Sequence, residues 1–238
     1  MILLIKKKYF AAAAGGAAIF LLLMLGILFQ QQNVPVFASH DNAPVLIIDA
    51  GHGGEDGGAV AMDGTVESEI NLAVAKRLRE ILCFTGHDVV MTREEEKSLS
   101  ENSKGTLRER KRLDLERRVE LVNHHPNAIL ISIHQNSLPN YFSVHGAQVF
   151  YNTQEGSEIL AEAIQEQLNL WINTDKAKSH KPIDPSIYLM KNIHCRAVLV
   201  ECGFLSNAEE TKKLKQPGHQ TLLALTIAAG IFPFLQEK

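Results

Sequence analysis

The sequence predicts an α/β fold, a single domain with a twisted, mostly parallel sheet and helices on both faces, preceded by an N-terminal hydrophobic segment. Short apolar runs rich in β-branched residues alternate with longer segments of helical periodicity. The apolar runs have no polar face, which is typical of parallel strands covered by helices on both sides. With 238 residues, 45% of them hydrophobic and 21% charged, the chain is long enough for one well-buried domain.

The N-terminus has the features of a membrane-targeting sequence. Three lysines at positions 6–8 precede an apolar run over residues 9–29. We expect residues 1–29 to be a signal peptide or a membrane anchor, and both alternatives stay open. The run is long enough to span a bilayer, whereas the small residue Ala38 fits a cleavage site. Either way the lysines stay in the cytoplasm and the remainder is exported, with residues 30–43 as a linker and 44–238 as the catalytic domain.

The charge balance excludes one class of partner. The formal net charge is −3, and the first 38 residues contain three lysines and no acidic residue, so the rest of the chain is more acidic than the whole. No basic surface is therefore predicted, and we expect no binding to nucleic acid.

The elements follow in order after the linker. Residues 45–49 form the first expected strand, a glycine-rich loop follows at 51–58, and residues 67–84 have the periodicity of an amphipathic helix. The charged stretch 94–112 is expected to be a loop. The remaining expected strands are 88–91, 129–133, 147–151, 187–190 and 197–200, and the remaining expected helices are 113–122, 157–170 and 221–235. The three cysteines lack C-x-x-C spacing and are expected to be buried free thiols: Cys83, Cys195 and Cys202.

Three expected strands each end next to a side chain that can do chemistry. These side chains are His52, His134 and Glu201. The carboxyl ends of neighbouring parallel strands meet at one edge of a sheet, where α/β proteins place their sites. Taken singly, His52 fits an ordinary turn and His134 fits a hydrogen-bonded core histidine. Glu201 is harder to explain without function, because a carboxylate at the end of a buried strand is costly unless it is paired or binds a metal.

A fourth candidate, Glu67, begins the expected helix 67–84, where the helix dipole alone favours an acid. Together the four residues match the needs of a hydrolytic zinc site. Two imidazoles and one carboxylate leave the fourth zinc position open, and a further carboxylate can move protons. The chain has no H-E-x-x-H motif, which excludes the thermolysin-type arrangement.

Four short blocks of sequence resemble the motifs of a known enzyme family. In chain order they are residues 47–54 (IIDAGHGG), 67–72 (ESEINL), 132–136 (SIHQN) and 200–207 (VECGFLSN). They resemble the blocks of the zinc-dependent N-acetylmuramoyl-L-alanine amidases of the amidase-3 type. The resemblance extends over essentially the whole predicted domain.

The resemblance implies a zinc ion held by His52, Glu67 and His134, with Glu201 as the catalytic acid–base. It also implies the reaction, which is hydrolysis of the amide between the lactyl group of N-acetylmuramic acid and the L-alanine of peptidoglycan stem peptides. One block departs from the family pattern. Where relatives usually have Glu-Lys-Asp, this chain has Glu-Ser-Glu at 67–69, so Glu69 competes with Glu67 for the ligand position.

A finer resemblance concerns the germination-specific subgroup found in endospore formers. The segments 115–123, 146–151 and 187–192 are similar to that subgroup, as is the single-domain build. The similarity implies action on spore-cortex peptidoglycan, paired in function with a muramic acid deacetylase that completes muramic lactam. It also implies a location in the cell wall or the spore intermembrane space, secreted or anchored to the membrane through the N-terminal segment.

Two other functions stay open on the residues alone. One is a zinc peptidase that cuts within wall peptides, and the other is a non-catalytic peptidoglycan-binding module. The presence of all four chemical positions argues against the second. Among further polar residues, we expect Asp49 either to orient His52 or merely to end its strand. Three others are candidates for the substrate groove: Arg93, Asn136 and His194.

Overall fold

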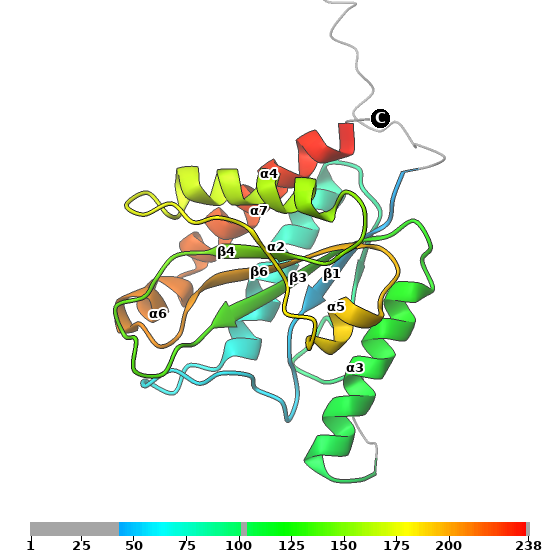
Figure 1. Ribbon diagram of the computed structural model, residues 1–238. Coiled ribbons are helices and arrows are strands. Elements are labelled where there is room, and N and C mark those ends of the chain that lie inside the picture. Colours follow the sequence, from blue (N-terminus) through cyan, green and yellow to red (C-terminus); the bar gives the residue numbers. More distant parts are fainter. Residues whose placement is uncertain (1–42, 101–103, 237–238) are drawn as a thin grey trace, which may run out of the picture. The chain divides into compact units, whose positions relative to one another are not determined.

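The first strand begins only a few residues after the predicted linker and enters the centre of a six-stranded sheet (Figure 1). The computed structural model describes residues 43–100 and 104–236. The expected signal peptide or anchor and nearly all of the expected linker lie outside the described residues. The strands are β1 (Leu46–Ala50), β2 (Val89–Met91), β3 (Ile129–Asn136), β4 (Gln148–Tyr151), β5 (Lys181–Pro182) and β6 (Arg196–Phe204).

The sheet is mostly parallel, as the sequence predicted. Its strand order is β2-β1-β3-β6-β4-β5, and all neighbouring pairs are parallel except β4 with β6. The central strands β1, β3 and β6 run side by side in one direction, so their carboxyl ends meet at one edge. This edge is where the four chemical residues of the sequence are expected to gather.

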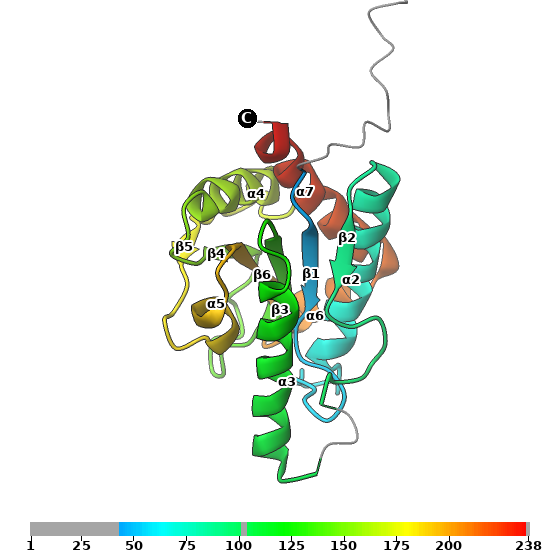
Figure 2. The same cartoon turned by 90° about the vertical axis from the view of Figure 1, so that its right-hand side faces the viewer.

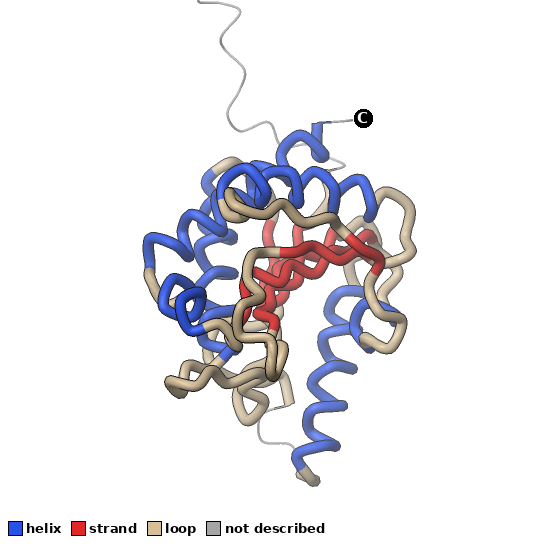
Figure 3. The backbone as a smooth tube through the Cα atoms, turned by 60° about the vertical axis from the view of Figure 1, so that its left-hand side comes forward, coloured by secondary structure: helices blue, strands red, loops and turns tan. Residues whose placement is uncertain are grey.

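Helices cover both faces of the sheet (Figures 2 and 3). They are α2 (Glu67–Phe84), α3 (Leu107–Asn123), α4 (Ser157–Trp171), α5 (Tyr188–Asn192), α6 (Ala208–Leu214) and α7 (Pro217–Gln236). The β1 side chains alternate between two apolar clusters, because successive residues of a strand point to opposite faces. Leu46 and Ile48 pack with α2, α4 and α7, whereas Ile47 packs with residues of α3 and α5.

The helix α7 is long and apolar enough to cross a membrane, and it is the one such helix among residues 43–100 and 104–236. Its apolar side chains are nevertheless used within the domain. Leu223, Ile227 and Ile231 are completely buried in the same cluster as the inner residues of α2 and α4. The helix is therefore a core helix of this domain.

Several expected boundaries were wrong. The segment 187–190 is not a strand, because residues 188–192 form the short helix α5, closed by the hydrogen bond from Lys191 N to Ile187 O. Helix α3 begins six residues earlier than expected, within the presumed loop. Helix α6 was not expected at all, and α7 begins at Pro217. Of the cysteines, Cys195 and Cys202 are buried as predicted, but Cys83 near the end of α2 is exposed.

Candidate metal centre and catalytic site

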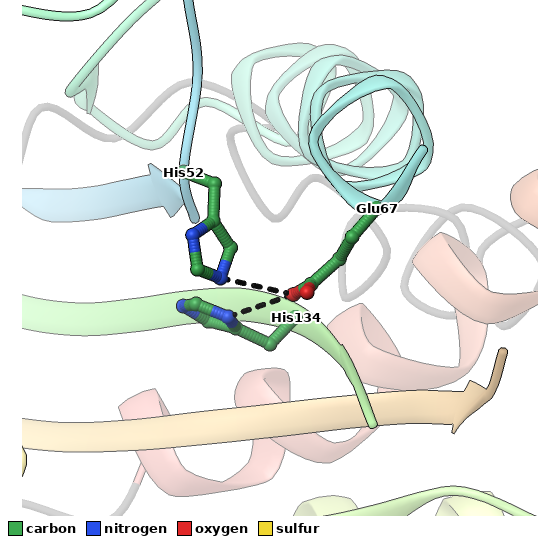
Figure 4. Close-up of side chains that lie close together, drawn as sticks. All are labelled: His52, Glu67 and His134. Carbon is green, nitrogen blue, oxygen red and sulfur yellow. Dashed lines mark hydrogen bonds and ion pairs between the residues drawn. The ribbon is translucent and has the colours of Figure 1, made fainter. Parts of the chain in front are cut away.

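Three of the predicted site residues lie together at the carboxyl edge of the sheet. His52 follows β1, Glu67 is the first residue of α2, and His134 belongs to β3 (Figure 4). Glu67 Oε1 lies 3.4 Å from His52 Nε2 and 3.0 Å from His134 Nδ1. One ligand atom from each of the three residues lies within 4.8 Å of the other two. Such spacing suits ligands that each bind zinc at about 2.0–2.2 Å.

The pairing of the strands brings these residues together. In the parallel ladders, Ala50 pairs with Ile133 across β1 and β3, and His134 pairs with Glu201 across β3 and β6. Glu201 therefore lies beside His134. Both residues belong to their strands and do not follow them, because β3 and β6 continue farther than the sequence predicted.

The structure separates Glu67 from its competitor Glu69. Glu67 is 3% exposed and accepts hydrogen bonds from Ala59 N (2.8 Å), Gln135 N (3.1 Å) and Asn71 Nδ2 (3.2 Å). Glu69 is exposed and lines a different surface pocket with Asp63 and Lys215. Only the first of the two carboxylates faces the histidines.

Two glycines make room for the three candidate ligands. A Cβ atom at Gly51 would lie 2.3 Å from the imidazole ring of His134, and one at Gly58 would lie 2.5 Å from Glu67 Oε2. Gly58 also has a φ of +72°, which L side chains rarely adopt. The glycine-rich loop therefore allows a closeness of backbone and ligand side chains that other residues would prevent. The residues present fit a metal ion.

The imidazole of His52 is oriented by a residue that the sequence analysis missed. His52 Nδ1 lies 2.9 Å from Asp56 Oδ2, and Asp56 is paired with Lys111 at 2.6 Å. Metal-binding histidines commonly donate their second N–H to a carboxylate, which leaves the other nitrogen free for the metal. The available signal was the pattern after His52, in which Asp56 stands between two Gly-Gly pairs (GGEDGG, residues 53–58). A pocket of about 440 Å³ opens beside Asp56 and is also lined by Lys111.

Asp49, the residue considered for this orienting role, does not contact His52. It is buried and paired with Arg118, and it accepts hydrogen bonds from Ser132 Oγ (2.6 Å) and Thr92 Oγ1 (2.8 Å). Burial opposes its charge, but these partners outweigh burial and lower the pKa of Asp49 to about 2. Asp49 therefore does not contact the candidate ligands directly. It binds Arg118, which donates to His52 O.

The three ligand residues are strongly coupled. Burial acts to lower the pKa of His52, but its hydrogen bonds to Asp56 and Glu67 outweigh burial and raise that pKa to about 10. Burial likewise acts to raise the pKa of Glu67, and the two histidines outweigh it and hold that pKa far below the usual range. The carboxylate thus stays ionised between two imidazoles. The negative charge of Glu67 favours a positive charge beside it. In the metal-free protein this charge is the proton held by His52.

Glu201 has a different environment from Glu67. Burial is the main cause that raises its pKa, to about 7, and the negative charge of Glu67 adds to this effect. Its Oε2 is buried and has no hydrogen-bond partner. A carboxyl group that titrates near neutrality and has a free oxygen is suited to accept and return a proton. The two buried acids therefore differ in chemical character although they lie in one site.

Two of the groove candidates are placed elsewhere. The side chain of Arg93 is buried and donates to backbone carbonyls, so it does not face substrate. His194 lies at the opposite edge of the sheet, beside Pro44 and Ala128. Asn136 ends β3 at the site edge and is half-buried, and its carbonyl accepts a hydrogen bond from Leu205 N.

Comparisons with known proteins show the family to which the chain is similar. Residues 46–232 match the family described as N-acetylmuramoyl-L-alanine amidase. The chain is 41% identical over 198 residues to the germination-specific N-acetylmuramoyl-L-alanine amidase of Bacillus subtilis, which covers 82% of this chain and 81% of that protein. It is 28% identical to the N-acetylmuramoyl-L-alanine amidase AmiA of Escherichia coli, over 80% of this chain and 75% of that protein.

Solved structures have the same fold. The CwlD amidase from Clostridioides difficile, solved in complex with the GerS lipoprotein, superposes with a TM-score of 0.78 at 37% identity and covers 82% of this chain and 100% of that one. An N-acetylmuramoyl-L-alanine amidase from Clostridium difficile 630 gives a TM-score of 0.72 at 27% identity, with coverages of 83% and 100%.

Proposed function

This chain belongs to the N-acetylmuramoyl-L-alanine amidase family and is a peptidoglycan hydrolase, and from this premise we propose that His52, Glu67 and His134 hold a zinc ion and that Glu201 is the catalytic acid–base. The observation that carries the proposal is the cluster of three ligand atoms within 4.8 Å, with Glu201 paired to His134 on the neighbouring strand. A zinc ion there supplies a Lewis acid for the scissile carbonyl and lowers the pKa of water.

The chain's own residues divide the remaining work. Asp56 accepts a hydrogen bond from His52 Nδ1–H and so keeps the Nε2 atom directed at Glu67 and the metal position. Glu67 supplies the permanent negative charge. Glu201, with its raised pKa and its unpartnered Oε2, takes a proton from the attacking water and gives it to the leaving nitrogen of L-alanine.

We extend the proposal to the substrate and its place in the cell. The similarity to a germination-specific amidase supports spore-cortex peptidoglycan as the substrate, cut between the lactyl group of muramic acid and L-alanine. Removal of the stem peptide leaves the lactyl carboxylate free for a deacetylase to complete muramic lactam. The N-terminal segment, as signal peptide or anchor, delivers residues 44–238 to the cell wall or the spore intermembrane space. The lipoprotein complex of a relative supports a lipoprotein partner for this chain too.

The experiment that tests the activity uses full-length protein in mild detergent, loaded with zinc and incubated with purified cortex and vegetative-wall fragments. The products are identified by mass spectrometry. The expected result is release of intact stem peptides and stem-free muramic acid, lost after treatment with a chelator and lost in Glu201→Gln. Thermal unfolding of the variant checks that it is folded.

Other outcomes would redirect the assignment. Cleavage between two amino acids of the stem would make the protein a peptidase. A folded protein that binds zinc and wall fragments without forming product, with or without the lipoprotein partner, would make it a binding module. Equal rates on cortex and vegetative-wall fragments would contradict the proposed cortex specificity but would still support amidase activity.

A further inference from the structure

Arg93 is a buried cation that the proposed reaction does not use. Its side chain is 2% exposed, and all five of its N–H groups have acceptors. Nε donates to Ala50 O (2.9 Å), and Nη2 donates to Gly51 O (3.1 Å) and Ser68 O (2.8 Å). Nη1 donates to Glu95 O (3.0 Å) and to Glu96 Oε2 (3.1 Å). A lysine offers only three donors and lacks the planar fork.

Three of the five acceptors of Arg93 belong to the two segments that carry the proposed metal ligands. Ala50 and Gly51 lead directly into His52, and Ser68 directly follows Glu67. Along the chain, 14 residues (53–66) separate His52 from Glu67. The rigid guanidinium of Arg93 ties the end of β1 to the first turn of α2 across this separation.

The segment before the ligand histidine needs such support. His52 has a φ of +61°, a left-handed conformation that is unfavourable for a residue with a side chain. A second buried arginine acts on the same backbone, since Arg118 donates to Ala50 O (2.9 Å) and His52 O (2.6 Å). Asn71 of α2 also reaches this segment, since its Nδ2 donates to Gly51 O (3.1 Å) and to Glu67 Oε1 (3.2 Å). Arg93 differs from Asn71 in being a charged fork that donates to the backbone of both segments.

We propose that Arg93 is a positioning residue of the metal centre, which fixes the separation of the His52 and Glu67 segments and thereby raises the affinity for zinc. The inference rests on the proposed function, because it assumes that these residues bind zinc. It predicts that loss of the guanidinium weakens zinc binding in protein that is still folded. The chemistry at saturating zinc is little changed, because Arg93 touches none of the reacting groups.

The test compares three full-length proteins in detergent: the unaltered chain, Arg93→Lys and the control Arg79→Lys. Arg79 is an arginine of α2 whose guanidinium pairs with Glu94 at the surface, away from the ligand segments. Zinc affinity is measured by competition with a chromophoric chelator, below the unfolding temperature of each metal-free protein. We expect Arg93→Lys to bind zinc about 10–100-fold more weakly, the range typical for residues that orient metal ligands, and Arg79→Lys to bind it normally. Excess zinc should restore kcat in Arg93→Lys.

A second variant serves if Arg93→Lys does not fold. Glu96 is the one charged acceptor of Arg93 and also accepts from Ser68 Oγ, and its side chain is 39% exposed. Glu96→Ala should therefore fold and bind zinc several-fold more weakly. Unchanged zinc affinity in the folded variants overturns the inference and leaves Arg93 a structural residue. Absence of zinc binding by the unaltered chain overturns the proposed metal centre itself, and the inference with it.

Discussion

Glu201 is expected to lower the stability of the fold when it is ionised, although the proposed reaction needs its carboxylate. Its carboxyl pKa is raised from 4.5 to about 7, mainly by burial. Below about pH 4.5 the group is protonated in both the folded and the unfolded chain and has no effect on stability. As the pH rises through the interval up to 7, only the folded protein retains the proton, so the free energy of unfolding falls and the full cost is present above pH 7.

A neutral replacement should therefore stabilise the protein while removing catalysis. We expect Glu201→Gln to raise the free energy of unfolding of the metal-free protein at pH 8, by at most about 3 kcal/mol, with no gain at pH 4. Urea unfolding at the two pH values measures this difference. A variant that is less stable than the unaltered protein at pH 8 would contradict a costly buried carboxylate.

The two acids at the start of α2 provide a matched pair. Glu67→Gln removes the ionised carboxylate between the histidines, and we expect zinc binding to fall below detection and amidase activity with it. Glu69→Gln changes an exposed acid two residues away and should leave both unchanged. Chelator competition and the stem-peptide release assay measure the two quantities. Loss of zinc binding in Glu69→Gln alone would reverse the ligand assignment.

The four candidate site residues could be predicted from the sequence, but the residues that support them could not. His52, His134 and Glu201 each stand at the end of an apolar run, and this position marks the site edge of a parallel sheet. Asp56, Arg93 and Asn71 could not be assigned in this way, because their roles depend on contacts made across the fold. Arg93 was misjudged for the same reason, since a sequence does not show that a cation is buried.

At the scale of single elements, α3 shows where periodicity fails. The helix begins at Leu107, after Thr106, whose side chain accepts from Glu109 N while the Glu109 carboxylate accepts from Thr106 N. This capping box was readable as T-L-R-E. It was overlooked because only Asp114, Arg118 and Val122 of the helix are buried, so no apolar stripe marks it. The first half of α3 extends beyond the sheet (Figure 2).

Because little packing supports that half of α3, its cap should be needed for stability. We expect Thr106→Ala to lower the free energy of unfolding by about 1 kcal/mol. Thr174→Ala, at an exposed loop position, should lower it by much less. Denaturant unfolding of both variants measures the difference, and equal values for the two would mean that the start of α3 is frayed.

The short elements α5 and α6 were unpredictable for a related reason. Five residues of α5 are too few to display a helical period, and its buried pair Leu189 and Met190 fits a strand equally well. By contrast, the bounds predicted for α2 were correct, because eighteen residues display the period clearly. A helix is therefore predictable from its periodicity when it is long and has a continuous buried face, as α2 does and α3 does not.

At the scale of the whole molecule, the buried pair of Asp49 and Arg118 joins β1 to α3 near the carboxyl end of β1. The pKa of Asp49 is lowered from 3.8 to about 2, so the charged form stabilises the fold. This stability is fully present above about pH 4 and is lost as the pH falls towards 2. It should amount to about 2 kcal/mol.

Acid unfolding of the metal-free protein measures this contribution. The free energy of unfolding should fall steeply between pH 4 and pH 2, and part of the slope should be absent in Asp49→Asn. That variant should also be less stable at pH 7, by about 3 kcal/mol, because buried Arg118 loses one of its two carboxylate partners and keeps only Asp114. An unchanged acid slope in a folded Asp49→Asn would assign the slope to other carboxylates.

The helix α7 has a consequence for the order in which the protein is made. Its twenty residues complete the cluster formed with α2 and α4, and Gly230 packs so closely on Ile164 that a Cβ atom would meet its backbone at 2.5 Å. The apolar sides of α2 and α4 therefore lack their cover until α7 has been made and has packed against them. The domain cannot complete its core one helix at a time, and before α7 docks the uncovered faces favour aggregation.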